Sequence, residues 1–199
     1  MRAAGLVDIQ EIDPTIQVSL MYASTDNFVG VNMYGDLKKA YLLPHFAEKL
    51  RKAQRKLKSE KGEQYSLIIH DAARPLSVQR KMWNSVKGTP NSVYVAPPSN
   101  GGGRHNYGAA VDITIINLDT GEELDMGSPV DYFGERAHIN IEASLVKRGL
   151  ITQEAANNRA YLMQLMNSQD LRAIRKEWWH FQERNSISYV RKTYQLLDF

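Results

Sequence analysis

The stretch Gly101-Gly102-Gly103-Arg104-His105-Asn106-Tyr107-Gly108-Ala109-Ala110-Val111-Asp112 runs from a glycine-rich loop into an apolar segment that ends near Ile116. This pattern predicts a loop that leads directly into a buried strand. It also places a histidine and an aspartate a few residues apart. A second cluster far along the chain, Glu177-Trp178-Trp179-His180-Phe181, adds another histidine and another acid. Together the two clusters supply the side chains of a metal site.

His105, Asp112 and His180 are the predicted metal ligands. A catalytic zinc ion typically has three nitrogen or oxygen ligands from the protein and keeps a fourth position for water. The chain has no cysteine, so thiolate ligands, disulfides and a thiol nucleophile are excluded. We therefore expect one Zn²⁺ per chain and a metal-dependent hydrolase. The alternative is that each cluster holds only surface or core side chains, which is the common role of isolated acids and histidines.

Glu177 is the predicted general base, because a metal-held water needs a nearby carboxylate to take its proton. In a regular strand, Glu177 and His180 would point to opposite faces, since strand side chains alternate. The hypothesis therefore requires a turn or bulge before Trp178.

Length and composition fit one domain over residues 1–199, with 43% hydrophobic residues to build a core. The 25 basic residues nearly match the 22 acidic ones, which gives a net charge of +3 and no indication of nucleic-acid binding. The basic run over residues 49–58 follows a helical pattern and reads as a solvated face. No segment resembles a membrane span or a signal peptide. These features favour a cytoplasmic protein; a signal peptide removed before Arg2 would instead make it periplasmic or exported.

Strand-like and helix-like segments alternate irregularly, which favours an α+β fold. Pro44 and Gly62 are typical of the ends of a helix over 44–60, and Ser77 and Thr152 are candidate caps of helices over 77–86 and 152–167. A long loop is expected over 88–103 and a hairpin over 109–124. The expected strands are residues 18–22, 65–70, 109–117 and 178–182.

Five ordered segments resemble the D-alanyl-D-alanine dipeptidases, a family of zinc peptidases. They are residues 22–30, Asp71-Ala72-Ala73-Arg74-Pro75, the 105–112 segment, Met126-Gly127-Ser128-Pro129-Val130-Asp131 and Glu177-Trp178-Trp179-His180. The resemblance covers nearly the whole chain. It implies a single α+β domain with a central antiparallel sheet, flanking helices and a zinc ion in a small cavity.

The resemblance also implies roles for single residues. His105, Asp112 and His180 would hold zinc, and Glu177 would act as general base and then as proton donor. Arg74 would face the scissile carbonyl and stabilise the oxyanion; without the resemblance, Arg74 would more simply pair with Asp71.

Asp131 would receive the free ammonium group of a dipeptide, and its alternative role is to cap a turn. Tyr22, Asp26, Asn27 and Phe28 match a family segment that lines the pocket, but we expect a core tyrosine and a turn there, with no part in the chemistry. Gly103 and Tyr107 depart from the family pattern, in which serine and arginine are common. The missing serine hydroxyl leaves substrate recognition open. His45, His70 and His138 are expected to be structural.

The predicted function is zinc-dependent hydrolysis of D-alanyl-D-alanine to two D-alanines. One alternative is a D,D-carboxypeptidase or endopeptidase that acts on longer peptidoglycan stem peptides through the same ligand set. Another is a binding domain that holds cell-wall peptide without cleaving it, although Glu177 would have no purpose there. The sequence indicates no oligomeric state.

Overall fold

In the computed structural model, which describes residues 1–198, most strands belong to one mixed sheet. Its order is β2 (Gln17–Val18), β4 (Tyr65–Asp71), β5 (Ala110–Asn117), β8 (Glu177–Glu183) and β7 (Leu171–Ile174), with β6 (Glu122–Glu123) beside β5. Strands β1 (Val7–Asp8) and β3 (Tyr41–Leu42) form a separate pair. The pairings from β4 to β7 are antiparallel, whereas β2 is parallel to β4. The α+β prediction is confirmed, but the sheet is antiparallel only in part.

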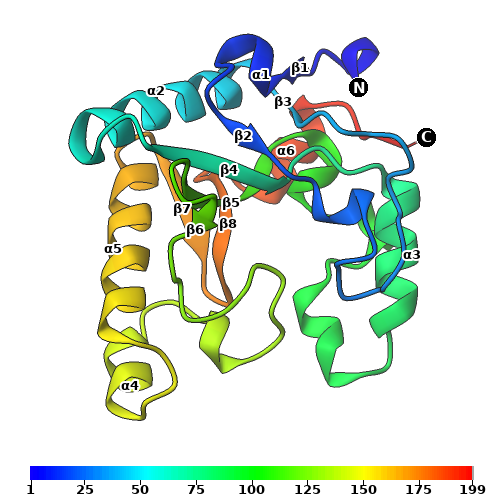
Figure 1. The fold of residues 1–199 in the computed structure, drawn as a ribbon. Helices are drawn as coiled ribbons and strands as arrows, with labels where there is room; N and C mark the ends of the chain where they lie inside the picture. The colour runs from blue at the N-terminus through cyan, green and yellow to red at the C-terminus, as the bar shows by residue number, and fades with distance from the viewer. Residues whose placement is uncertain (199) are drawn as a thin grey trace.

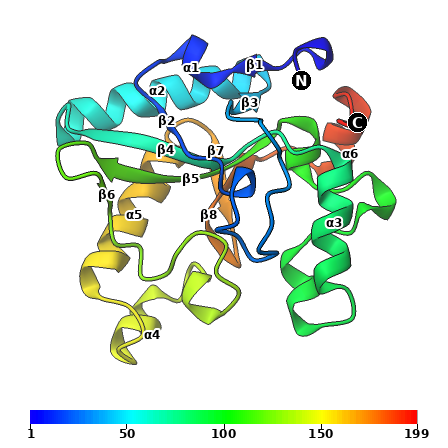
Figure 2. The same cartoon turned by 45° about the vertical axis from the view of Figure 1, so that its right-hand side comes forward.

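The two longest helices pack against the sheet. The α-helices within residues 1–198 are α1 (Ile9–Ile12), α2 (Pro44–Lys61), α3 (Leu76–Val86), α4 (Glu142–Lys147), α5 (Gln153–Asn167) and α6 (Ile187–Thr193). Helix α2 contacts β4, α5 contacts β7, and these two helices contact each other. Figure 1 shows α2 across the top and α5 along the left, with α3 on the opposite side of the molecule. In Figure 2, β2, β4 and β5 lie side by side beneath α2.

Strand β5 has one apolar face in the core and one face that carries Asp112. Val111, Ile113 and Ile115 are fully buried in the main hydrophobic core. Alternate residues of a strand point to opposite faces, so Asp112 lies on the other face. Strand β8 repeats this arrangement, with Phe181 in the core and His180 beside Asp112 across the strand pairing. Burying each large apolar side chain contributes about 1.5–3 kcal/mol, and this packing holds the polar face in place.

Most predicted elements are confirmed, and their ends have clear local causes. Pro44 occupies the first turn of α2, and Gly62 ends it with φ of 108°, which disfavours other residues. The Thr152 hydroxyl accepts a hydrogen bond from the backbone N–H of Ala155 and caps α5. Ser77 is not a cap, because α3 begins one residue earlier, after Pro75. The 109–124 hairpin forms as expected.

Two predicted segments differ from the structure. The strand expected over 18–22 ends at Val18, and a 3-10 turn over Met21–Ala23 follows. The turn lets the carbonyl of Tyr22 accept hydrogen bonds from the N–H groups of Met33 and Tyr34. The loop over 88–103 contains two 3-10 turns, Pro90–Tyr94 and Pro98–Asn100. Of the helices in residues 1–198, none is long and apolar enough to span a bilayer.

Candidate active site

All six predicted site residues line one cavity of about 580 Å³. One wall is the polar face of β5 and β8, and the others come from the segment after β4, the 88–103 loop and the loop that follows β6. This volume is within the usual range for small-molecule sites. The six residues are His105, Asp112, His180, Glu177, Arg74 and Asp131.

The three predicted ligands are buried and form a compact triad. His180 Nδ1 lies 3.1 Å from both His105 Nε2 and Asp112 Oδ1, and the last two atoms are 3.4 Å apart. Ligand atoms of a tetrahedral zinc ion, at about 2.0–2.1 Å from the metal, are about 3.3 Å from one another. Two nitrogens and one carboxylate oxygen are also a donor set that zinc accepts. The residues present therefore fit a zinc ion.

Hydrogen bonds outside the triad orient both imidazoles. His105 Nδ1 lies 2.8 Å from the carbonyl oxygen of Ala72, so Nδ1–H donates and Nε2 faces the triad without a proton. His180 Nε2 lies 3.2 Å from Gln182 Oε1, which leaves Nδ1 toward the triad. Such partners fix the tautomer and ring orientation of metal-binding histidines. Burial alone would raise the pKa of Asp112, but His105 and His180 more than offset it and lower the pKa far below its usual value.

Glu177 reaches the same side of the sheet as His180 because β8 contains a bulge. Ala173 of β7 pairs with Phe181 and Ile174 pairs with Glu177, so Trp178, Trp179 and His180 have no partner on β7. A turn or bulge was predicted before Trp178; the structure has the irregularity, and it spans residues 178–180. The Glu177 carboxylate lies 3.8 Å from His180 Nδ1. Burial raises the pKa of Glu177 to about 7, since the opposing attraction of His180 is weaker.

Arg74 pairs with Asp71 and also lines the cavity, so its two expected roles are compatible. Its Nε donates to Asp71 Oδ2 at 3.0 Å, and Nη1 donates to Gln79 Oε1 at 2.9 Å. Its Nη2 lies 3.9 Å from Asp112 Oδ2. Burial would lower the pKa of Arg74, but Asp71 and nearby groups raise it well above its usual value. The guanidinium is thus a fixed cation beside the triad.

Asp131 lies in the cavity wall, with φ of 65°, a backbone conformation that few residues adopt without cost. Its Oδ2 accepts a hydrogen bond from the Tyr22 hydroxyl at 2.8 Å. Burial raises the pKa of Asp131 to about 7, although this hydrogen bond opposes the rise. An acid held in such a place would gain from a bound cation.

Comparison with known proteins identifies the family. A family model described as D-ala-D-ala dipeptidase matches residues 2–197. The chain belongs to this family. Among curated proteins, it is 29% identical over 184 residues to the D-alanyl-D-alanine dipeptidase of Escherichia coli (strain K12), which covers 92% of this chain and 87% of that protein. It is also 29% identical over 196 residues to the D-alanyl-D-alanine dipeptidase of Enterococcus faecium, which covers 89% of this chain and 90% of that protein. The protein is thus a metallopeptidase.

The site also contains side chains for which the sequence predicted no part in the chemistry. The Tyr34 hydroxyl donates to Asp71 Oδ1 at 2.5 Å, and Gln79 fixes the other side of Arg74. Tyr22, expected to be only a core residue, donates to Asp131. Tyr34 and Asp71 are 37 residues apart, and no periodic pattern links them. Of these contacts, the sequence predicted only the Asp71–Arg74 pair, because the two residues are three positions apart.

The remaining histidines of this dipeptidase-family chain lie outside the triad. His45 contacts Glu183, and His70 contacts the carbonyl of Ser19 and the carboxylate of Glu123. His138 Nε2 lies 3.2 Å from the Tyr94 hydroxyl near the cavity. A side chain at Gly103 would begin 3.3 Å from the Ala96 methyl, so a serine here would need a small shift. Tyr107 is buried and is not part of the cavity wall.

Proposed function

We propose that this protein is a zinc-dependent dipeptidase that hydrolyses D-alanyl-D-alanine to two D-alanines. One observation carries the proposal: a single cavity holds the His105–Asp112–His180 triad, a carboxylate beside it, a fixed cation and a second acid in the wall. The names of the matched relatives and the family support the choice of substrate. The substrate is a small dipeptide; no nucleic acid or membrane is needed.

Zinc, when bound by the triad, supplies a water of lowered pKa and polarises the peptide carbonyl. Glu177 takes the proton of the attacking water as the new C–O bond forms. Arg74 then stabilises the negative charge that develops on the carbonyl oxygen. Glu177 returns the proton to the leaving nitrogen as the C–N bond breaks, so one water is consumed for each bond cleaved.

Asp131 and Tyr22 would position the substrate. The ammonium group of a dipeptide can lie against the Asp131 carboxylate, which the Tyr22 hydroxyl orients. A charge-assisted hydrogen bond of this kind is stronger than a neutral one. A bound ammonium would also offset the cost of ionising Asp131 in the wall.

The test is release of free D-alanine from D-alanyl-D-alanine by protein loaded with zinc, with D-alanyl-D-lactate as a second substrate. Rapid cleavage of the dipeptide that stops on removal of zinc and returns on its addition supports the proposal. No release would contradict it and turn attention to longer stem peptides. Zinc content of the His180→Ala variant tests the ligand set, because full retention would remove His180 from it.

A further inference from the structure

We propose that three aromatic side chains, Phe28, Tyr94 and Phe133, set the length of the substrate by closing the cavity beside Asp131. We call them the aromatic clasp. The inference rests on the proposed dipeptidase function and adds to it the residues that exclude peptides extended at the amino end. None of the three belongs to the metal triad or takes part in proton transfer.

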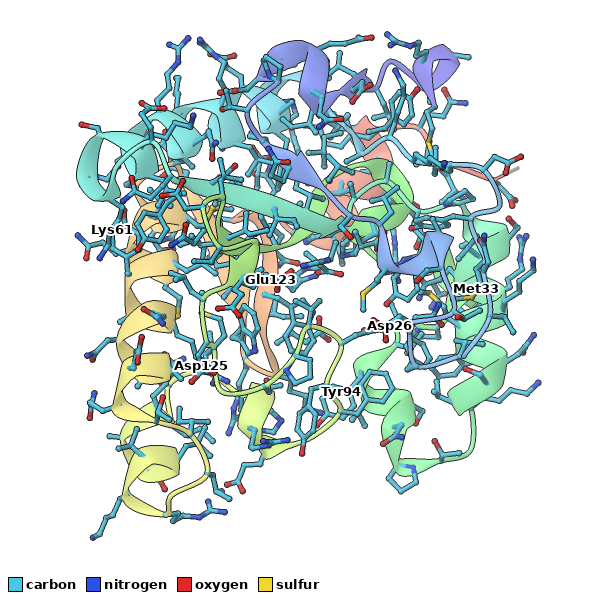
Figure 3. The ribbon with its side chains drawn as sticks, in the orientation of Figure 1. Asp26, Met33, Lys61, Tyr94, Glu123 and Asp125 are labelled. Carbon is cyan, nitrogen blue, oxygen red and sulfur yellow. The ribbon has the colours of Figure 1, made fainter. Side chains whose placement is uncertain are left out.

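The clasp joins three segments that are far apart in the sequence. The rings of Tyr94 and Phe133 are stacked, with centroids 4.9 Å apart and planes 5° from parallel. Phe28 packs against Phe133, with their ring centroids 4.8 Å apart. Figure 3 shows Tyr94 between the segment after α3 and the loop that follows Asp125. The stack therefore links the segment after α3 to the loop that follows β6, beside the cavity that Phe28 and Tyr94 line.

Contacts from further residues hold Tyr94 in this position. Its hydroxyl lies 3.2 Å from His138 Nε2, and Lys176 Nζ lies 5.4 Å from the centroid of its ring. Aromatic pairs and a cation above a ring each add attraction beyond simple burial. By contrast, the neighbouring Val93 is 59% exposed, so the backbone of this segment lies at the surface. The side chain of Tyr94 is thus fixed mainly by the clasp and its two neighbours.

The clasp lies next to the acid that would bind the substrate's ammonium group. Phe133 follows Asp131 by two residues in the same loop. Tyr22, which donates to Asp131, packs edge-on against Phe28 with centroids 6.3 Å apart. Phe28, Tyr94 and Asp131 all line the cavity. A residue attached to the substrate's amino nitrogen would therefore run into the clasp.

A steric wall is needed here because charge alone does not exclude longer peptides. The Asp131 carboxylate can accept a hydrogen bond from the amide N–H of an extended peptide as well as from an ammonium group. Burying a carboxylate against a neutral donor is less favourable, but it is not prohibitive. The clasp supplies the repulsive element that specificity requires.

The experiment compares kcat/KM for three peptides. They are D-alanyl-D-alanine, L-alanyl-D-alanyl-D-alanine, which is extended at the amino end, and D-alanyl-D-alanyl-glycine, which is extended at the carboxyl end. The clasp variants are Tyr94→Ala and Phe133→Ala, whose wild-type side chains are both partly exposed. We expect each to raise the ratio of amino-extended to dipeptide cleavage at least tenfold. The ratio for the carboxyl-extended peptide should not change.

Two further variants separate the clasp from general effects. Tyr94→Phe keeps the stacked ring and should keep the wild-type ratio. Tyr189→Ala removes a tyrosine that is 48% exposed on α6 and should leave all three rates unchanged. Thermal melting and zinc content confirm that each variant is folded and loaded.

The outcomes test the aromatic clasp and the dipeptidase function separately. If wild-type protein cleaves the dipeptide but Tyr94→Ala and Phe133→Ala keep its ratio, the clasp does not set substrate length. Wild-type protein that already cleaves the amino-extended peptide as well as the dipeptide would overturn the inference in the same way. If neither wild-type protein nor any variant releases D-alanine from the dipeptide, the proposed function itself fails.

Discussion

Glu183 is buried and Asp131 is half-buried in the cavity wall, and the surroundings of their carboxylates are opposite. Glu183 accepts hydrogen bonds from Lys49 Nζ at 2.7 Å and Asn185 Nδ2 at 3.1 Å, and His45 Nε2 lies at 3.3 Å. Within residues 1–198, the one hydrogen-bond donor to the Asp131 side chain is the Tyr22 hydroxyl. Glu183 is surrounded by cationic and polar donors, whereas Asp131 faces a cavity.

The pKa values follow from these surroundings. Hydrogen bonds from His45 and Lys49 lower the pKa of Glu183 to about 2, against the effect of burial. Burial raises the pKa of Asp131 to about 7. The fold therefore favours the ionised form of Glu183 and disfavours that of Asp131. The protein supplies several donors to Glu183, whereas Asp131 keeps hydrogen-bonding capacity toward the cavity, as the proposed binding of a substrate ammonium group requires.

The largest expected effect comes from Glu177, another acid that faces the cavity. Glu177→Ala should lower kcat by about 10³-fold or more, because general base catalysis contributes about 10²–10⁴. Zinc content should stay at one per chain, since Glu177 is not a predicted ligand. Stopped assays with direct metal analysis measure both quantities. Activity above about a tenth of wild type would remove Glu177 from the role of base.

Asp131→Asn should weaken binding of the dipeptide and, at high pH, stabilise the fold. We expect kcat/KM for the dipeptide to fall about 10- to 100-fold, mostly through KM, because one charge-assisted hydrogen bond is lost. The folded state raises the pKa of Asp131 from 3.8 to about 7, so its stabilising effect is complete below about pH 4 and is lost as pH rises through 7.

The asparagine cannot ionise, so this variant should gain stability relative to wild type at pH 8. We expect a difference of about 2 kcal/mol in the free energy of unfolding, which disappears below about pH 4. Urea denaturation of both proteins with zinc removed measures it. A variant that is less stable than wild type at pH 8 would contradict the comparison.

Glu183→Gln should have the opposite signature. The folded state lowers the pKa of Glu183 from 4.5 to about 2, so its stabilising effect is present above pH 4.5 and is lost as pH falls through 2. We expect a loss of about 2 kcal/mol at pH 7, which shrinks as pH falls and disappears below about pH 2. Dipeptide cleavage should change by less than about twofold. A large loss of kcat with normal stability would mean that Glu183 belongs to the active site after all.

Local sequence patterns were sufficient to predict that His105, Asp112 and His180, the candidate metal ligands, lie together. The alternation along β5 places Asp112 opposite Val111 and Ile113, which are buried in the core. The requirement that Glu177 and His180 share a face predicted an irregular strand, and the three-residue bulge in β8 provides it. Patterns of two or three residues along one strand are visible in a sequence because backbone geometry imposes them.

Contacts between separate loops could not be predicted in this way. Tyr22 and Asp131 are 109 residues apart, and the stack of Tyr94 on Phe133 joins two loops without periodic structure. The positive φ of Asp131 also has no clear signal, because glycine is the default residue in this conformation. The short parallel strand β2 was overestimated because its apolar run continues into a 3-10 turn. Only tertiary packing determines these features.

Lys49→Met has the smallest expected effect. It tests how much of the stabilising effect of Glu183 comes from a single donor. The substitution removes the closest donor but leaves His45 and Asn185 in place. Because Lys49 is partly exposed, we expect a loss below about 1 kcal/mol at low salt and less at high salt. Urea denaturation at two salt concentrations measures it. Lys56→Met, which removes an exposed ion pair with Glu60 on the same helix, is the control.

If Lys49→Met lost as much free energy of unfolding as Glu183→Gln, a single ion pair would explain the stabilising effect of Glu183. A smaller, salt-dependent loss would show that the donors act together, as the low pKa of Glu183 indicates.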